Sequence, residues 1–314
     1  MTLRPLPGAA PPGVGAPAYP GAVHHDPATL LPPALDAERL RRALTGGTES
    51  PYTAIDVVEE IGSTNAELLA RASRGAPDRS VLLAEFQSSG RGRLGRAWTA
   101  PPRSQVAVSV RLRPGAVSPP LFGWLPLVTG LAVRDALRQA GGVDATLKWP
   151  NDVLVDGGKI AGILVEMTTV PAGGDFSVRL PAVVVGVGIN VTLTREQLPV
   201  AHAPSLELAG GATDRDALAR SVLEALALRH RQWRECERGS GSSISDELMT
   251  TYSAACSTLG ARVRVELPGD LVRAGTADRV DREGRLVVVD TDGEFAVAAG
   301  DVTHVRGARG RWGD

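Results

Sequence analysis

Residues 147–166 have the sequence LKWPNDVLVDGGKIAGILVE. Two apolar runs flank Asp156-Gly157, and an Asp-Gly pair in this setting is a strong signal for a β-hairpin with a tight turn. The pattern predicts strands at Thr146–Trp149, Val153–Val155 and Ile160–Met167. Such a hairpin brings two cations, a carboxylate and an amide to one end of a sheet: Lys148, Lys159, Asp152 and Asn151.

The segments on either side of this hairpin predict an α+β fold. Hydrophobic periodicity and turn signals predict helices at Ala34–Leu44, from Ser63 to about Ser73, at Leu121–Ala140, Asp214–Arg234 and Ser245–Ser257. Further strands are expected at Ile55–Glu60, Val81–Phe86, Gln105–Arg111 and Pro181–Val187. Because hairpins succeed one another and helices lie over them, we expect a mixed or antiparallel sheet and not a series of βαβ units.

The pattern changes at Gly260. Five short strands are expected at Arg262–Glu266, Val272–Val280, Arg285–Val289, Glu294–Val297 and Val302–Val305, which together predict a small β-barrel. Residues 1–33 are rich in Pro, Gly and Ala, a composition typical of a disordered tail. We therefore divide the chain into the tail 1–33, a helix and linker 34–50, a central domain 51–258, the barrel 259–308 and a basic tail 309–314.

The composition argues against several classes of protein. A formal net charge of -1 gives no field to attract nucleic acid or an anionic membrane. Cys236 and Cys256 have no paired spacing and the five histidines have no ligand spacing, so neither a disulfide framework nor a cysteine-rich zinc site is expected. The N-terminus lacks the pattern of a secretory signal, and the longest near-apolar run, 121–133, is too short to span a bilayer. We expect a cytoplasmic protein without a nucleic acid or membrane partner.

The distribution of basic residues points to the same hairpin. Of the 34 Lys and Arg residues only Lys148 and Lys159 are lysines, and both lie in this motif. Arginine serves surface solubility equally well, whereas a compact ammonium suits a site where a point charge follows a moving phosphate or carboxylate. Coincidence is the alternative in a sample of two.

Residues 90–98, GRGRLGRAW, follow the strand predicted to end at Phe86. The glycines allow a ligand to approach the backbone closely. Arg91, Arg93 and Arg96 supply fork-shaped donors for a phosphate or carboxylate, and Trp98 would cover a flat ring or exclude water. A disordered basic loop or an RNA-binding patch is the simpler alternative. The position between two buried strands favours a ligand-binding loop that orders on binding.

The hairpin itself carries groups suited to nucleotide chemistry. The ammonium groups of Lys148 and Lys159 would neutralise charge on a phosphorus under attack, and Asp152 would help to hold Mg²⁺ or orient a nucleophile. A hairpin with ordinary surface charges is the alternative, which the clustering of the only lysines disfavours.

Two further motifs are weaker. VVVGVGIN at 183–190 has alternate glycines in an apolar strand, which signals a close approach by a ligand or by backbone, and Asn190 would bridge to a nucleotide. A tightly packed core strand has the same pattern. GSTN at 62–65 is by default a helix N-cap. Together with Gln87, its small polar side chains also suit a neutral hydrogen-bonding ligand such as a ureido ring.

In this order and spacing, GSTN, EFQSSGRGRLGRAW, LKWPNDVLVDGGKIAGILVE and VVVGVGIN resemble the biotin protein ligases over roughly residues 55–306. The resemblance implies a mixed sheet covered by helices, related to the class II aminoacyl-tRNA synthetase domain, and a C-terminal SH3-like barrel. It implies a ligase that uses ATP, biotin and Mg²⁺, with the biotin carboxyl carrier domain of a carboxylase as its partner. The oligomeric state stays open, with a homodimer among the alternatives.

The resemblance also implies roles for matching positions. The ureido end of biotin would be bound by Ser63, Thr64, Asn65 and Gln87, in a pocket lined by Gly162 and Leu164. The loop that closes over biotin and the phosphate would contain Gly90, Arg91, Gly92 and Arg93. Lys159 would contact the biotin carboxylate and the α-phosphate, Arg91 would assist catalysis, and Asp152 would position or deprotonate the acceptor lysine. ATP would be bound by Arg91, Arg93, Arg96, Trp98, Lys148, Asn151, Lys159, Asn190 and Arg306. Of these, Lys148, Asn151 and Asn190 would serve ATP together with its metal.

The sequence departs from the family pattern in two places, and three other functions are alternatives to a biotin ligase. Some family members begin with a winged-helix DNA-binding domain, whereas a proline-rich segment and one helix are expected here, so we expect no DNA-binding role. The loop 194–208 lacks the aromatic that some relatives place over adenine. A lipoate or octanoate ligase on the same fold would need a longer apolar tunnel without a polar head pocket. A biotin-sensing transcriptional regulator and a catalytically silent binding module are the remaining two rivals, and retention of both lysines disfavours the silent module.

Overall fold

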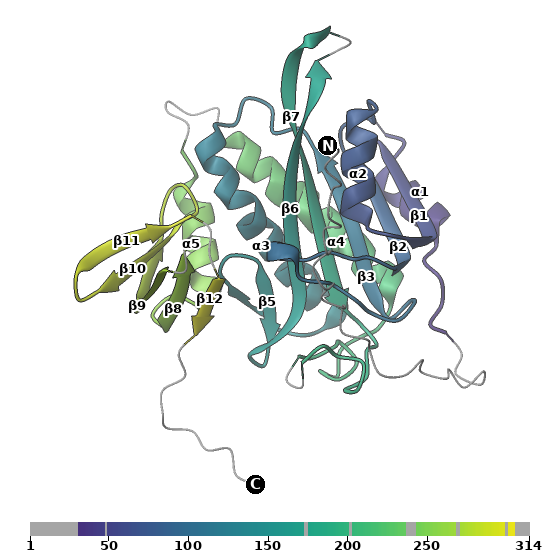
Figure 1. The fold of residues 1–314 in the computed structure, drawn as a ribbon. Helices are drawn as coiled ribbons and strands as arrows, with labels where there is room; N and C mark the ends of the chain where they lie inside the picture. The colour runs from purple at the N-terminus through teal and green to yellow at the C-terminus, as the bar shows by residue number, and fades with distance from the viewer. Residues whose placement is uncertain are drawn as a thin grey trace, which may run out of the picture. The chain divides into compact units, whose positions relative to one another are not determined.

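A seven-stranded mixed sheet forms the centre of the molecule (Figure 1). The computed structural model describes residues 31–47, 49–172, 175–200, 203–236, 243–267, 271–298 and 301–304. The strand order is β1 (Ala54–Ile61), β2 (Ser80–Gln87), β3 (Gln105–Leu112), β7 (Asp175–Asn190), β6 (Gly158–Ala172), β5 (Asp152–Val155) and β4 (Thr146–Lys148). Only β1 and β2 are parallel, and the other neighbours are antiparallel. The prediction of a mixed sheet is therefore confirmed.

The hairpin between β5 and β6 has the predicted turn. Asp156 and Gly157 have φ values of 50° and 76°, which is the left-handed conformation that a two-residue hairpin turn requires at both positions. Glycine and aspartate tolerate this conformation better than most residues. The turn fixes the register that brings Asp152 opposite Gly162 and Leu154 opposite Lys159.

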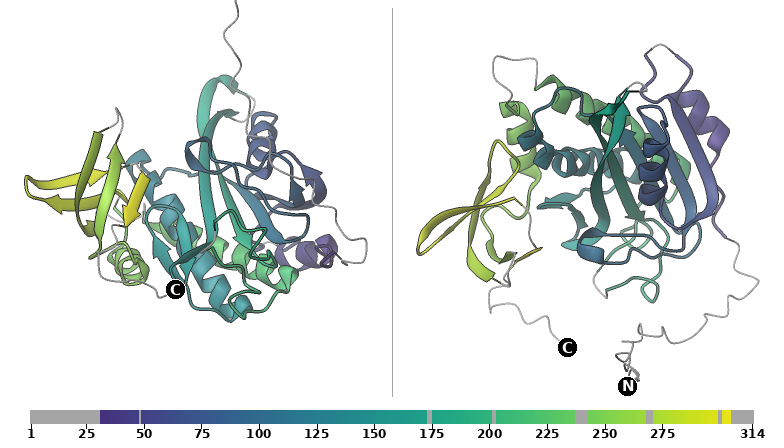
Figure 2. Two further views of the ribbon diagram at one scale, coloured as in Figure 1. Left: turned by 60° about the horizontal axis from the view of Figure 1, so that its bottom comes forward. Right: turned by 45° about the horizontal axis from the view of Figure 1, so that its top comes forward.

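The β6–β7 hairpin is longer than the sequence suggested. We predicted strands ending at Met167 and beginning at Pro181, but β6 extends to Ala172 and β7 begins at Asp175. The paired ends project beyond the rest of the sheet (Figures 1 and 2). A two-stranded projection has free edges, where a proline without an N–H costs no ladder hydrogen bond. Pro171 and Pro181 therefore do not end these strands.

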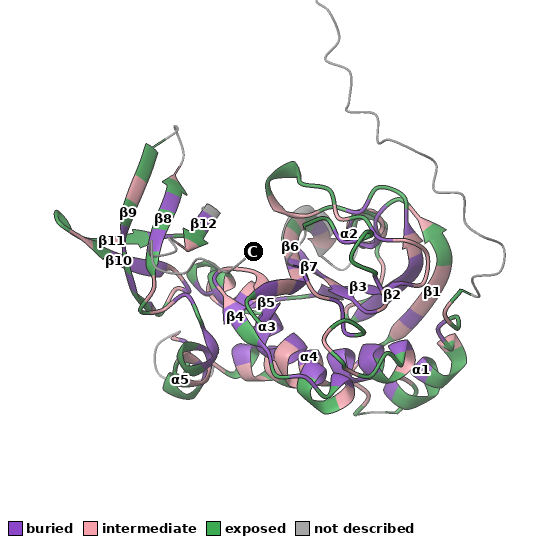
Figure 3. Cartoon of the chain, turned by 90° about the horizontal axis from the view of Figure 1, so that it is seen from below, coloured by how far each residue is buried: buried purple, intermediate pink, exposed green. Residues whose placement is uncertain are grey.

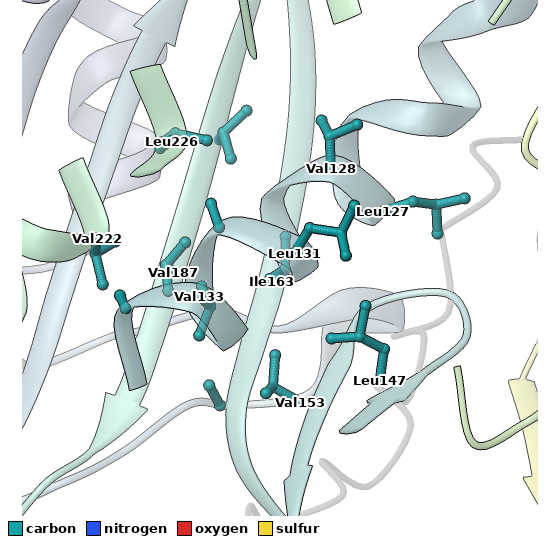
Figure 4. Close-up of a cluster of buried hydrophobic side chains, with 14 of the residues drawn as sticks. Leu127, Val128, Leu131, Val133, Leu147, Val153, Ile163, Val187, Val222 and Leu226 are labelled. Atoms are coloured by element: carbon teal, nitrogen blue, oxygen red, sulfur yellow. The ribbon is translucent and has the colours of Figure 1, made fainter. Parts of the chain in front are cut away.

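Three helices cover one face of the sheet: α1 (Ala37–Leu44), α3 (Leu125–Ala136) and α4 (Arg215–Glu235). Seen from below, the sheet lies between these helices and α2 (Thr64–Ser73) (Figure 3). Alternate residues of the strands, such as Ile163 and Val187, point into the core beneath α3 and α4 (Figure 4). The residues between them point to the opposite face, which is the face that carries the site.

The predicted helix Leu121–Ala140 is divided into three parts. A 3₁₀ segment, Pro119–Trp124, precedes α3, and a π turn, Leu137–Gly141, follows it. Pro126 explains the first boundary, because proline is accepted in the first turn of an α-helix but not in its interior. Gly142, with φ of 70°, ends the last turn.

The C-terminal part is a five-stranded antiparallel sheet that follows α5 (Asp246–Ala255). Its strand order is β11 (Gly293–Val297), β10 (Leu286–Asp290), β9 (Leu271–Val280), β8 (Arg262–Leu267) and β12 (Asp301–His304). All five expected strands are present, but within the described ranges no pairing of β11 with β12 closes a barrel. Trp149 Nε1 donates to Gly284 O at 3.0 Å, so this sheet is bonded to the end of β4.

Several expectations fall wholly or largely outside the described residues. These are the tail 1–33, of which residues 1–30 are not described, the end of the last strand at Val305, and the basic tail 309–314. Across the described part of the chain, none of the helices has the length and apolar character needed to cross a membrane.

Candidate active site

A cavity of about 290 Å³ opens on the face of the sheet that carries α2. It is lined by residues from β2, β6, β7, the start of α2, the loop 90–98 and the turn between β4 and β5. The predicted site residues that line it are Ser63, Thr64, Asn65, Gln87, Arg91, Gly92, Arg93, Arg96, Trp98, Lys148, Asn151, Asp152, Lys159, Gly162 and Leu164. Segments separated by about a hundred residues in the sequence thus line one cavity, as the motifs predicted.

The floor of the cavity is a buried hydrogen-bonded network at the start of α2. Gln87 Oε1 accepts from Thr64 N at 2.9 Å and from Thr64 Oγ1 at 3.0 Å. Ser109 Oγ lies 2.7 Å from Thr64 Oγ1 and 2.6 Å from Asn65 Oδ1. Asn65 Nδ2 donates to Leu164 O at 3.2 Å and to Glu166 Oε2 at 2.9 Å. The default interpretation of GSTN also holds, because Ser63 caps α2 by accepting from Ala66 N.

The loop 90–98, called the flap below, is a small hairpin in this structure. Gly92 N donates to Arg96 O at 2.7 Å, and Trp98 N donates to Gly90 O at 2.9 Å. Leu94 and Gly95, with φ of 56° and 73°, form its tip. The segment is thus ordered and lines the cavity, which disfavours the alternative of a disordered loop, while ordering on ligand binding stays a prediction.

Two flap arginines already contact the cavity wall. Arg91 Nη2 lies 3.1 Å from Glu166 Oε2, and Arg93 Nη1 donates to Asn151 Oδ1 at 2.9 Å. Glu166 also accepts from Asn65, so a single carboxylate joins the flap to the floor. Movement of the flap would therefore change the contacts of Glu166 and, through them, the hydrogen bonds of the floor network.

Trp98 and Asn65 explain the alternate glycines of β7. The indole Nε1 of Trp98 donates to Gln105 Oε1 at 2.7 Å, which holds the ring flat against the sheet. A Cβ on Gly188 would lie 2.4 Å from that nitrogen, and a Cβ on Gly186 would lie 2.2 Å from Asn65 Oδ1. We predicted a close approach by a ligand or by backbone, whereas the groups that approach are these two side chains.

The two lysines line the cavity from β4 and β6, which lie on either side of β5 in the sheet. Lys159 Nζ lies 2.6 Å from Asp152 Oδ1 and 5.6 Å from the centre of the Trp98 ring. Lys148 lies near His304 of the C-terminal sheet. Burial lowers the pKa of His304, and the positive charge of Lys148 lowers it further. His304 is therefore neutral at physiological pH and adds no third cation.

The turn that carries Asn151 and Asp152 is held from two sides. Asn151 Nδ2 donates to Ile163 O at 3.1 Å, which ties the turn to β6. Trp149 N donates to the hydroxyl of Thr258 at 3.0 Å, and His304 Nε2 lies 3.1 Å from the same hydroxyl. Thr258 is fully buried. The chain that leads into the C-terminal sheet thus positions the residues between the two lysines.

Two of the predicted residues that the structure describes do not line the cavity. Gly90 lies at the base of the flap, where a Cβ would lie 2.2 Å from Trp98 O. Asn190 is buried at the end of β7, and its amide donates to Pro204 O at 3.2 Å. Arg306 lies outside the described residues. Within the described part of the chain, no group of three or more His, Cys, Asp or Glu side chains could hold a metal ion.

The sequence analysis missed three site residues: Ser109, Glu166 and Gln105. Ser109 and Gln105 are polar residues four positions apart, on the same face of a strand that is otherwise apolar except for Arg111, and both are completely buried. A buried polar side chain needs a partner, so this pattern was a usable signal. Glu166 closes the quoted motif, but nothing local distinguishes it from a surface carboxylate.

Comparison with known proteins identifies the family. The model of the biotin/lipoate A/B protein ligase family matches residues 57–190. The biotin–[acetyl-CoA-carboxylase] ligase of Mycobacterium tuberculosis is 42% identical over 280 residues, which cover 88% of this chain and 98% of that protein. The chain belongs to the biotin protein ligase family.

Two further comparisons agree with this membership. The bifunctional ligase/repressor BirA of Bacillus subtilis is 30% identical over 254 residues, covering 79% of this chain and 72% of that protein. The solved structure of the biotin protein ligase from Aquifex aeolicus in complex with biotin and ATP has a TM-score of 0.64 and 25% identity. It covers 82% of this chain and 100% of that one. This solved structure therefore shares the fold over most of the chain.

Proposed function

We propose that this protein activates biotin with ATP and transfers it to a lysine of the biotin carboxyl carrier domain of a carboxylase. In the first step the biotin carboxylate attacks the α-phosphorus of ATP, giving biotinyl-5′-AMP and pyrophosphate. In the second step the acceptor amine attacks the carbonyl carbon of this mixed anhydride, and AMP leaves. The observation that carries the proposal is one cavity that combines a buried polar floor, both lysines and the flap arginines.

The hydrogen-bond inventory of the floor supports biotin as the acid. Three short oxygen–oxygen contacts join Gln87 to Thr64, Thr64 to Ser109, and Ser109 to Asn65. Only two hydroxyl hydrogens, those of Thr64 and Ser109, are available for these three contacts. The floor therefore has more acceptors than hydrogens. A ureido ring supplies two N–H donors, whereas the far ends of lipoate and octanoate supply none. An apolar acid would leave the spare acceptor capacity of the floor unused, so the floor favours an acid with N–H donors at its far end.

The lysines and arginines support the adenylation step. Charge builds up on the α-phosphoryl group as the carboxylate attacks and pyrophosphate leaves. Lys159, Lys148 and Arg93 are cations positioned before the reaction, so they stabilise that charge without reorganising in the transition state. Lys159 lies closest to the floor and we assign it the contact with both the carboxylate and the α-phosphate.

The donor set fits a magnesium ion that is bound mainly through the nucleotide. Mg²⁺ with ATP typically takes one or two protein oxygens and otherwise phosphates and water. Asn151 and Asp152 present side-chain oxygens to the cavity beside the lysines, and we assign them this role. When bound, the ion would neutralise phosphate charge.

Transfer requires an acceptor lysine to reach the carbonyl carbon as a neutral amine. Asp152 is partly buried at the cavity wall, and we assign it the positioning of that amine. The mixed anhydride hydrolyses readily in water, so the flap protects it by closing over the cavity, with Trp98 excluding solvent from the reacting atoms.

We propose the remaining assignments on the same basis. Residues 51–258 form the catalytic domain, and 259–308 form an SH3-like domain whose strand order and antiparallel pairing support it. The tail 1–33, the linker 34–50 and the basic tail 309–314 remain separate segments in this proposal. We infer a cytoplasmic location from the use of ATP, and a homodimer remains an alternative to a monomer.

Incubation with ATP, Mg²⁺, biotin and a purified carrier domain tests the function. A streptavidin blot should show the carrier labelled only when all four components and the protein are present. Lipoate and octanoate, detected by the mass of the carrier, should give no product under the same conditions. A carrier labelled by either of these acids but not by biotin would contradict the proposal.

A further inference from the structure

The flap rejoins the sheet at a point where two strands separate. β2 and β3 are paired as far as Ala84 and Ala107, but β2 continues to Gln87 and β3 begins at Gln105. Beyond that last pair, the backbone oxygen of Gln105 accepts from Arg215 Nε at 3.0 Å. A side chain of α4 therefore lies at the opening between the two strands, next to the base of the flap.

Arg215 is buried, and each nitrogen of its guanidinium group has an acceptor. Nε donates to Gln105 O, Nη1 donates to Pro33 O at 3.0 Å, and Nη2 donates to Glu85 Oε2. The other carboxylate oxygen of Glu85 accepts from Leu35 N at 2.6 Å. Two buried charges with these bonds keep a fixed geometry, because a lost bond would leave a charged group without a partner away from water. Arg215 thus ties the start of β3 to β2 and to the segment that precedes α1.

Gln105 connects this fixed point to the flap. Its backbone oxygen is held by Arg215, and its side-chain oxygen accepts from Trp98 Nε1 at 2.7 Å. The chain between Trp98 and Gln105 is held as well, since Arg103 N donates to Glu85 O at 2.8 Å. Trp98 lines the cavity, whereas Arg215 and Glu85 do not. Two consecutive residue contacts therefore lead from α4 to the indole ring.

We propose, on the basis of the proposed function, that Arg215 is a positioning residue for the flap and that Glu85 and the segment 33–35 hold it in place. Arg215 acts through Gln105 on the indole of Trp98. With the indole fixed, water is kept from the mixed anhydride until the acceptor lysine arrives. With the indole released, biotinyl-5′-AMP would still form, but water would hydrolyse it to biotin and AMP before transfer.

Arg215→Lys is the variant that tests this role. A lysine keeps a positive charge beside Glu85, but a single nitrogen cannot replace a planar fork with three bonded nitrogens. Should this variant fold poorly, Glu85→Gln is used, because it keeps the side-chain shape and removes the charge that orients the guanidinium. Arg229→Lys is the matched control: Arg229 lies on the same helix, and its Nε and Nη2 both donate to Asp135 Oδ2 of α3.

Two rates are measured for each full-length protein at saturating ATP and biotin. AMP formed without a carrier reports the adenylate that is lost to water, and labelling of the carrier domain reports the adenylate that is transferred. A variant that is merely destabilised has fewer active molecules, so both rates fall together and their ratio stays constant. The ratio of hydrolysis to transfer therefore isolates the position of the flap.

We expect this ratio to rise about fivefold in Arg215→Lys, the size of effect that loss of one hydrogen bond typically has, and to stay at the wild-type value in Arg229→Lys. Trp98→Phe removes the indole N–H and should raise the ratio too. Adding Arg215→Lys to Trp98→Phe should change it little further, because both substitutions break the same connection.

Equal ratios in Arg215→Lys and Arg229→Lys, or fully additive effects of Arg215→Lys and Trp98→Phe, would overturn the inference and leave the proposed function standing. A wild-type protein that neither forms biotinyl-5′-AMP nor labels the carrier would overturn the proposed function, and the inference with it.

Discussion

The glycines of β7 set the shape of the cavity at the level of single atoms. Gly186 and Gly188 are needed because Asn65 and Trp98 occupy the space that a side chain would fill. We expect Gly186→Ala to displace the Asn65 amide and weaken biotin binding at least tenfold, with a stability loss of about 1–3 kcal/mol from overpacking. Calorimetric titration with biotin measures the first effect and urea unfolding the second.

Gly62→Ala is the matched control for this variant. Gly62 lies directly before Ser63, has no positive φ, and a Cβ there would meet no heavy atom within 4 Å. Biotin affinity and stability close to wild type are expected. If Gly186→Ala bound biotin as tightly as Gly62→Ala, the floor network would not be the biotin site.

Lys159 tests the assignment of the adenylation step. Lys159→Ala removes the ammonium nearest to the floor, and loss of one preorganised charge-stabilising donor typically costs a factor of about 10²–10³ in rate. We expect pyrophosphate release to fall by at least that factor, while biotin binding weakens less, because the floor still holds the ureido end after the contact with the carboxylate is lost. Asp152→Ala should instead slow transfer to the carrier more than adenylate formation. Unchanged adenylation by the Lys159 variant would contradict the assignment.

At the scale of residues, local motifs predicted most of the cavity. The lysine count, the glycine-arginine loop and the GSTN cap each marked side chains that meet in the structure. What the sequence could not supply was the set of partners, because Glu166 meets Asn65 and Arg91 across separations of 101 and 75 residues. Asn190 was expected to bridge to a nucleotide, which stays a prediction. In the structure its amide donates to Pro204 O, a backbone partner that the sequence did not indicate.

The connection between the two sheets gives a prediction for whole elements. Thr258 accepts the N–H of Trp149 at the end of β4, and His304 of β12 contacts the same hydroxyl. Thr258→Val would leave a buried N–H unpaired, at a cost of about 1–3 kcal/mol. We expect a raised KM for ATP together with lowered stability, because the turn that follows Trp149 carries Asn151 and Asp152.

Thr258→Ser keeps the hydroxyl and serves as the control. It should restore the KM for ATP even if the smaller side chain lowers stability somewhat. Steady-state pyrophosphate release at varied ATP concentration measures both variants. Equal KM values in Thr258→Val and the wild type would show that the C-terminal sheet does not position this turn.

The sequence predicted the ends of helices and strands correctly where these ends depend on a few adjacent residues. The Asp156-Gly157 turn and the Ser63 cap were predicted and confirmed, because each depends on two or three adjacent residues. The division of the predicted helix at Pro126 and the extension of β6 and β7 past two prolines were not predicted. In both cases the effect of a proline on the element depends on whether the N–H that it lacks would have had a hydrogen-bond partner in the neighbouring strand or turn.

At the scale of the molecule, His230 links folding to pH. Burial lowers its pKa to about 3, and the charge of Arg234 adds to the effect. The unfolded chain therefore binds a proton that the folded chain does not, and stability falls as pH falls through about 6.5. Between pH 7.5 and 5.5 the loss is about 1.4 kcal/mol.

Urea unfolding of wild type and His230→Gln over this pH range measures that loss. The variant should lose about 1.4 kcal/mol less than the wild type on acidification, whatever its absolute stability. Burial lowers the pKa of His304 as well, so part of the dependence remains in the variant. Parallel curves for the two proteins would contradict a buried neutral His230.

The central claim is that one cavity binds biotin by its ureido end and activates its carboxylate with ATP. Biotin-dependent exchange of labelled pyrophosphate into ATP, measured without any carrier, isolates this step. We predict rapid exchange with biotin, none with lipoate or octanoate, and loss of exchange in Lys159→Ala. Exchange that is independent of biotin, or equally fast with octanoate, would contradict the account.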